Sequence, residues 1–137
     1  VGFNMLNQTA SKLIFPKTIK RNIGTLIMFP VRLAFSRTER LIKIIAELIE
    51  NGQLNRSDID LENPLEFIIN EGGAKDLIDA AYRFCRYESG ADITLSGTGD
   101  IEHLKANIES FLRPPLPKDD VLKLKNIFQN VDSVSGQ

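Results

Sequence analysis

A short turn of small and hydroxyl-bearing residues is the segment of this 137-residue chain best suited to chemistry. It contains Ser96, Gly97, Thr98, Gly99 and Asp100, between an apolar stretch and a helical pattern. Glycines permit a tight turn and the close approach of a ligand. Free amide N–H groups at a helix N-terminus attract phosphate, and Ser and Thr hydroxyls add donors. The pattern indicates a phosphate-binding turn. The alternative is a plain strand-to-helix turn in which Asp100 or Thr98 caps the helix and no ligand binds.

Few other residues support a reactive site. Cys85 falls on the apolar side of a helical pattern, which favours a buried, unreactive thiol. One cysteine and one histidine, His103, are too few for a zinc site. Arg32 either reaches a pyrophosphate or lies on a loop surface, and the alternating carboxylates of 58–62 are typical of a solvated loop.

Three apolar stretches alternate with longer helical patterns, which predicts successive βα units and a parallel sheet. The stretches are 1–6, 23–31 and 92–95. The second is almost continuously apolar, which is typical of a central strand covered on both faces. Helices are expected at 11–21 with a break at Pro16, and at 36–51, 74–88, 101–112 and 121–131, with a short apolar helix-like stretch from Pro64 to Gly72 and Gly73 and a surface loop at 53–63.

Two of these helices have periodic faces. In 74–88 the apolar face consists of Leu77, Ile78, Ala81, Phe84 and Cys85, and the opposite, solvent-facing side consists of Lys75, Asp79, Arg83 and Arg86. In 101–112 the stripe expected to face inward consists of Ile101, Leu104, Ile108 and Phe111. Gly52 and Gly90 end helices, as residues in a left-handed conformation do.

The composition is that of one compact soluble domain, with 42% hydrophobic and 26% charged residues in 15.4 kDa. A net charge of -1 gives no field that would gather nucleic acid or anionic lipid. No apolar run is long enough to span a bilayer, and the first residues do not form a signal peptide. With a single cysteine, these features predict a cytoplasmic protein that binds neither nucleic acid nor membrane.

Residues 93–108, ITLSGTGDIEHLKANI, resemble the last strand and cofactor helix of the aldo/keto reductases. Residues 1–7, VGFNMLN, resemble that family's sixth strand, and 22–31, NIGTLIMFPV, resemble its seventh, in the same order and spacing. The resemblance covers almost all of the chain. It implies an α/β fold, namely the C-terminal part of a (β/α)₈ TIM barrel with about three parallel strands and covering helices. It also implies an oxidoreductase that reduces carbonyls, or oxidises sugars and alcohols, with a nicotinamide cofactor.

The same resemblance assigns cofactor contacts to individual residues. The residues matching the turn that holds the adenosine phosphate are Ser96, Gly97, Thr98 and Gly99, with Thr98 as the phosphate-binding hydroxyl. Asn107 matches the asparagine at the adenine edge, one turn beyond His103. Met28 stands where many members stack an aromatic ring on the nicotinamide, and here the aromatic residue, Phe29, comes one place later.

Two departures from the family pattern bear on the choice between NAD and NADP. NADPH-selective members carry a lysine in the turn and an arginine on the helix, where this chain has Gly97 and His103. Ala106 replaces the glutamate that usually precedes the asparagine. Without the two cations that bind a 2′-phosphate, we expect NAD or NADP to bind with weak 2′-phosphate selectivity or a tilt toward NAD. His103 is either a ligand contact or an ordinary surface residue.

The resemblance covers none of the four strands that supply the family's Asp, Tyr, Lys and His tetrad. Tyr82 and Tyr87 fall on a helical pattern, so neither is placed to act as the tetrad tyrosine. We therefore expect residues 1–137 to form a single incomplete domain, the C-terminal half of a barrel, that is inactive alone and ends in a disordered tail at 132–137.

Three strands out of eight leave two sheet edges and an apolar face uncovered. We expect these surfaces to pair with the missing N-terminal half of the barrel, to associate with a second copy of the chain, or to rearrange. A competing hypothesis is a non-enzymatic α/β module that retains the phosphate turn and serves in binding or assembly.

Overall fold

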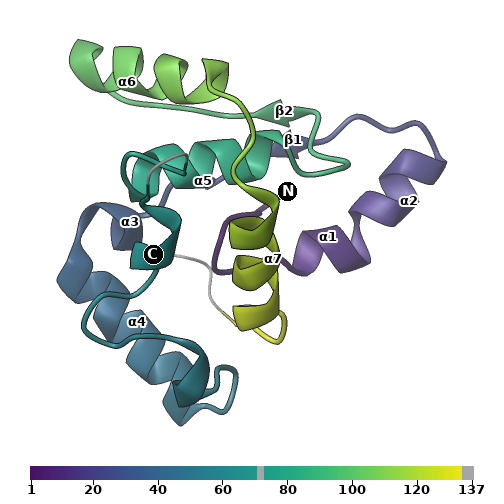
Figure 1. The fold of residues 1–137 in the computed structure, drawn as a ribbon. Coiled ribbons are helices and arrows are strands. Elements are labelled where there is room, and N and C mark those ends of the chain that lie inside the picture. Colours follow the sequence, from purple (N-terminus) through teal and green to yellow (C-terminus); the bar gives the residue numbers. More distant parts are fainter. Residues whose placement is uncertain (71–72, 134–137) are drawn as a thin grey trace.

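The computed structural model describes residues 1–70 and 73–133 as seven α-helices, two 3₁₀ helices and two short strands (Figure 1). Residues 71–72 and 134–137 lie outside the described residues, so the predicted end of the 64–73 stretch is described only at Gly73 and most of the predicted tail is not described. The elements in chain order are α1 (Thr9–Leu13), α2 (Phe15–Lys20), β1 (Leu26–Ile27), α3 (Leu33–Ser36), α4 (Thr38–Glu50), η1 (Arg56–Asp58), η2 (Glu66–Ile68), α5 (Leu77–Arg86), β2 (Ile93–Thr94), α6 (Ile101–Leu112) and α7 (Lys118–Ile127). None of the described helices is both long and apolar enough to cross a membrane.

Two parallel strands confirm the predicted sheet direction, and they are shorter than the sequence suggests. Leu26 of β1 pairs with Ile93 of β2. The first apolar stretch joins only through a parallel bridge between Gly2 and Met28, so the prediction of a strand at 1–6 is wrong in length. The reason is Asn4, whose side-chain oxygen accepts hydrogen bonds from the amides of residues 6 and 7 and turns the chain away from the sheet.

The two faces of the sheet have opposite environments. Phe3 and Ile27 are fully buried, and the Phe3 ring lies 5.3 Å from that of Phe15 and 5.4 Å from that of Phe84. The alternate side chains, on the other face, are about half exposed: Leu26, Met28, Ile93 and Leu95. The predicted central position of this strand is confirmed, because β1 lies between β2 and the bridge to Gly2. The prediction of cover on both faces is wrong for the described residues, because the side chains of the second face are about half exposed.

Helix α5 is the central element (Figure 1). Of its predicted apolar face, Ala81, Phe84 and Cys85 are buried, whereas Leu77 and Ile78 are only half-buried. Its predicted polar side is wrong for two residues, since Asp79 and Arg83 are 0% and 1% exposed. The Arg83 guanidinium donates to the Asp79 carboxylate and to the carbonyls of Gly73, Pro114 and Pro115. These acceptors satisfy the charge inside the protein and attach the segment after α6 to α5.

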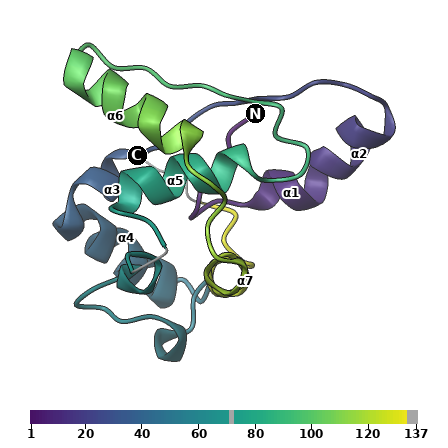
Figure 2. The same ribbon diagram turned by 45° about the horizontal axis from the view of Figure 1, so that its top comes forward.

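Helix α6 lies along α5 (Figure 2) and has the predicted bounds, but the predicted inward stripe is wrong. Ile101 is 70% exposed, and Leu104 and Ile108 are also exposed. The helix contacts α5 instead through Phe111, whose ring lies 4.7 Å from that of Tyr82, and through its buried polar residues Asn107 and Ser110. An apolar stripe is therefore left facing solvent.

Candidate functional site

A pocket of about 800 Å³ opens where the strands end at their carboxyl side. In parallel α/β folds this edge of the sheet is where ligands bind, and the volume suits a small-molecule ligand. The lining brings together seven of the eight residues expected at a cofactor: Met28, Phe29, Ser96, Gly97, Thr98, His103 and Asn107. Gly99 does not line it.

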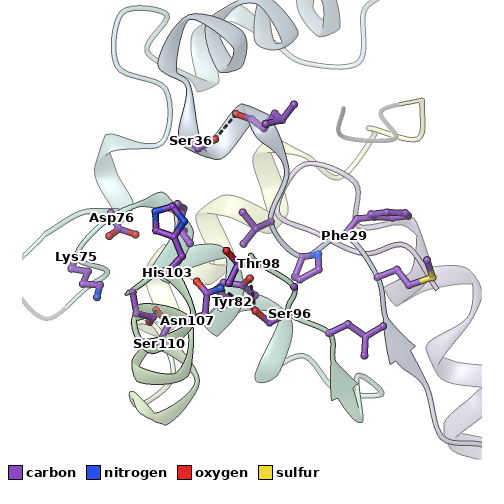
Figure 3. Close-up of a pocket in the computed structure, with 18 residues that line it drawn as sticks. Phe29, Ser36, Lys75, Asp76, Tyr82, Ser96, Thr98, His103, Asn107 and Ser110 are labelled. Atoms are coloured by element: carbon purple, nitrogen blue, oxygen red, sulfur yellow. Dashed lines mark hydrogen bonds between the residues drawn. The ribbon is translucent and has the colours of Figure 1, made fainter. Parts of the chain in front are cut away.

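The lining residues are spread along an elongated site. Figure 3 shows Phe29 at one end, Ser96 and Thr98 in the middle, and Asp76 and His103 at the other end. The segment 28–31 after β1 supplies the first end, which we call the β1 end, and the 95–98 segment after β2 supplies the middle. Helix α6 and the start of α5 supply the far end. An extended ligand with a central anionic group fits this order.

Ser96 is held by two neighbours on different helices. Its hydroxyl lies 2.9 Å from the Tyr82 hydroxyl and accepts a hydrogen bond from Asn107 Nδ2 at 3.0 Å. Tyr82 and Asn107 are both buried and both line the pocket. The first residue of the turn is therefore positioned by α5 and α6 together. Tyr82 is a site residue that its helical pattern did not reveal, because only its partner in the turn distinguishes it from a core tyrosine.

The turn that leads into α6 has its own internal hydrogen bonds. The Thr98 hydroxyl accepts from the Asp100 amide at 3.1 Å, and the Asp100 carboxylate accepts from the His103 amide at 3.0 Å. Asp100 is thus the N-cap of α6, as the alternative of a plain capped turn requires. The hydrogen bond from the His103 amide lowers the pKa of Asp100. The cap occupies the helix end, which leaves residues 96–98 as the part of the turn that an anion could approach.

Gly97 and Gly99 are not required by the fold itself. A Cβ atom built on either residue meets nothing within 4 Å, and neither residue has a left-handed backbone. Gly97 lines the pocket. The absence of a side chain at Gly97 therefore leaves open space at the middle of the pocket, where a ligand can approach the backbone.

The β1 end of the pocket contains both Met28 and Phe29. Strand alternation alone would place them on opposite faces. Phe29 has a left-handed backbone with φ of 62°, a strained conformation for a residue with a side chain, and both residues contribute to the same pocket. The Arg32 guanidinium lies 4.4 Å from the centre of the Phe29 ring. Arg32 does not line the pocket, so the possible pyrophosphate contact stays a prediction.

The chain is similar to known proteins in its structure and not in its sequence. No protein-family model matches the chain, and no curated protein matches its sequence. Two solved structures do match it: the holo and apo forms of aldo-keto reductase AKR11C1 from Bacillus halodurans, with TM-scores of 0.56 and 0.55 at 14% identity. The chain shares its fold with part of an aldo-keto reductase.

The matches cover 93% of this chain and only 42% and 43% of the two reductase chains. The chain thus spans less than half the length of those structures. The resemblance found in the sequence is confirmed at the level of the fold.

Proposed function

We propose that this chain is the C-terminal, nicotinamide-cofactor-binding part of an aldo/keto reductase-like oxidoreductase. The observation that carries the proposal is the single pocket lining that contains Met28, Phe29, Ser96 to Thr98, His103 and Asn107, at the carboxyl ends of parallel strands. The likeness of fold to a holo aldo-keto reductase supports it. Ser96 to Thr98 would hold the phosphates of NAD or NADP, and the α6 wall would hold the adenosine.

The residues present fit such a cofactor. The turn offers backbone amides and two hydroxyls to an anion, and Gly97 leaves space for close approach. Two apolar side chains, Met28 and Phe29, lie at the β1 end of the pocket. When bound, the cofactor supplies the hydride chemistry of the family. These residues would bind and orient the dinucleotide.

Catalysis itself is assigned to additional βα units. The half-exposed sheet face of Leu26, Met28, Ile93 and Leu95 and the exposed stripe on α6 are the surfaces that such units would cover. We assign them to the N-terminal half of a barrel, which would also bring the tetrad. A homo-oligomer that buries the same surfaces is the other outcome, and sedimentation of the chain over a range of concentrations distinguishes it.

Titration of the chain with ADP, NAD⁺ and NADP⁺, followed by the amide shifts of Gly97, Thr98 and Asn107, tests the proposal. Binding should move all three amides. Thr98→Ala removes one hydroxyl donor to a charged phosphate and should weaken binding about tenfold or more, the effect of losing one hydrogen bond to a charged group. Thr38→Ala, an exposed threonine of α4, is the matched control and should bind like the wild type. No shift at millimolar ligand would refute the proposal.

A further inference from the structure

We propose that Asp76 makes this pocket selective for a free ribose diol over a 2′-phosphorylated ribose, and hence for NAD over NADP. The inference rests on the proposed function, because it takes the adenosine end of the ligand to lie against α6. Asp76 lies in that end of the pocket, beside His103 (Figure 3). No residue pattern in the sequence identifies it as a site residue.

Asp76 presents a fixed carboxylate to the pocket. It is the N-cap of α5, and its Oδ1 accepts a hydrogen bond from the Asp79 amide at 2.8 Å. Within residues 1–70 and 73–133, its second oxygen accepts no hydrogen bond and is available to a ligand. A carboxylate accepts hydrogen bonds from ribose hydroxyls, as the acidic residue of many NAD sites does, and it repels a phosphate.

The competing charge is Lys75, which would attract a 2′-phosphate. Among the residues that line the pocket it is the only lysine or arginine. Its ammonium lies 3.6 Å from a carboxylate oxygen of Glu109, and its side chain is 40% exposed. A flexible, solvated and partly neutralised cation contributes little to a fixed site. Asp76 is exposed as well, but the helix cap holds its carboxylate in place, so its charge keeps a fixed position in the pocket.

The turn at residues 96–100 adds no positive charge to the pocket. Residues 96–100 contain no cation, and their single charged side chain is Asp100. The hydrogen bond from the His103 amide lowers the pKa of Asp100, so its carboxylate is ionised at neutral pH. Asp100 does not line the pocket, so the turn contributes only by lacking a cation, and a second phosphate near His103 would meet the carboxylate of Asp76.

The test compares two probes that differ only by the 2′-phosphate: 5′-AMP and adenosine 2′,5′-bisphosphate. Wild-type chain should bind 5′-AMP in preference. Asp76→Asn keeps the helix cap, because asparagine caps as well as aspartate, and removes the charge. It should shift the affinity ratio about three- to fivefold toward the bisphosphate, the size expected for a unit charge roughly 6–8 Å from a dianion in salt solution. Asp119→Asn, which removes an exposed charge of α7, is the control and should leave the ratio unchanged.

Lys75→Gln supplies the opposing arm and should change the ratio less than Asp76→Asn does. An unchanged ratio in Asp76→Asn, or a larger change in Lys75→Gln, would overturn the inference while leaving the proposed function intact, provided that the probes bind. If neither probe binds the wild-type chain, both the inference and the proposed function are overturned.

Discussion

Two glycine-to-alanine substitutions separate a glycine kept for a ligand from a glycine kept for the fold. At Gly97 a Cβ meets nothing within 4 Å, and the backbone is not left-handed. Gly97→Ala should therefore leave the fold intact and raise the free energy of unfolding by about 0.4–1 kcal/mol, because alanine restricts the unfolded chain more than glycine does. The new methyl group would occupy the open space in the middle of the pocket, so ADP binding should weaken tenfold or more.

Gly90, in contrast to Gly97, is required by the fold. Its φ is +88°, and a Cβ would lie 2.7 Å from Phe15 Cβ and 3.1 Å from Ile19 Cδ1. The left-handed backbone costs an alanine about 1–2 kcal/mol, and the clash with the packed Phe15 ring adds about 1–3 kcal/mol. Gly90→Ala should therefore lower the free energy of unfolding by roughly 2–5 kcal/mol.

Urea unfolding followed by far-UV circular dichroism measures the two stabilities, and titration with ADP measures binding. The reasoning about Gly97 is refuted if Gly97→Ala binds ADP as tightly as the wild type. It is also refuted if that variant is destabilised by more than about 1 kcal/mol, which would make the glycine a requirement of the fold.

Three further predictions concern stability and surface. Arg83→Met should cost about 3–5 kcal/mol in urea unfolding, because it leaves the Asp79 carboxylate buried beside fewer partners; a cost below 1 kcal/mol would contradict this. Burial raises the pKa of the Cys85 thiol above its value in the unfolded chain. The unfolded chain therefore loses the thiol proton first, and the free energy of unfolding should fall as the pH rises above about 9. Cys85→Ala should reduce that fall, and thiol reagents should label the native chain only as fast as it opens. Ile93→Lys, on the exposed sheet face, should change stability by less than about 0.5 kcal/mol and reduce association in sedimentation, whereas Ile27→Lys should unfold the chain.

Local signals in the sequence predicted the elements whose ends are set by neighbouring residues. Helix α6 was predicted with its observed bounds because Asp100 caps its start and Pro114 follows its end. The helical pattern restarts near Pro16 as predicted, because Pro16 lies in the first turn of α2. Gly52 has the left-handed backbone that its place after α4 predicts. Such positions depend on a few consecutive residues, so the pattern alone is sufficient.

Positions that depend on distant partners could not be predicted. Arg83 on α5 is buried because backbone carbonyls at 73, 114 and 115 accept its hydrogen bonds, and helical periodicity contains no record of them. Periodicity correctly identified which residues form the apolar stripe of α6, but the prediction that this stripe faces the core was wrong. A stripe such as Ile101 and Ile108 shows which side of a helix seeks apolar cover, and it does not show which element provides that cover.

The two ends of the pocket differ in what supports them. The middle and the α6 end are fixed within the described residues: Tyr82 and Asn107 hold Ser96, and Arg113 joins the end of α6 to Asp79 of α5. The β1 end, with Met28, adjoins the sheet face that nothing in the described part of the chain covers. Residues that are already held in place lose less conformational entropy when a ligand binds than residues that the ligand has to order. The adenosine half of a dinucleotide should therefore supply most of the affinity of this chain, and the nicotinamide half should contribute fully only once further βα units close over β1.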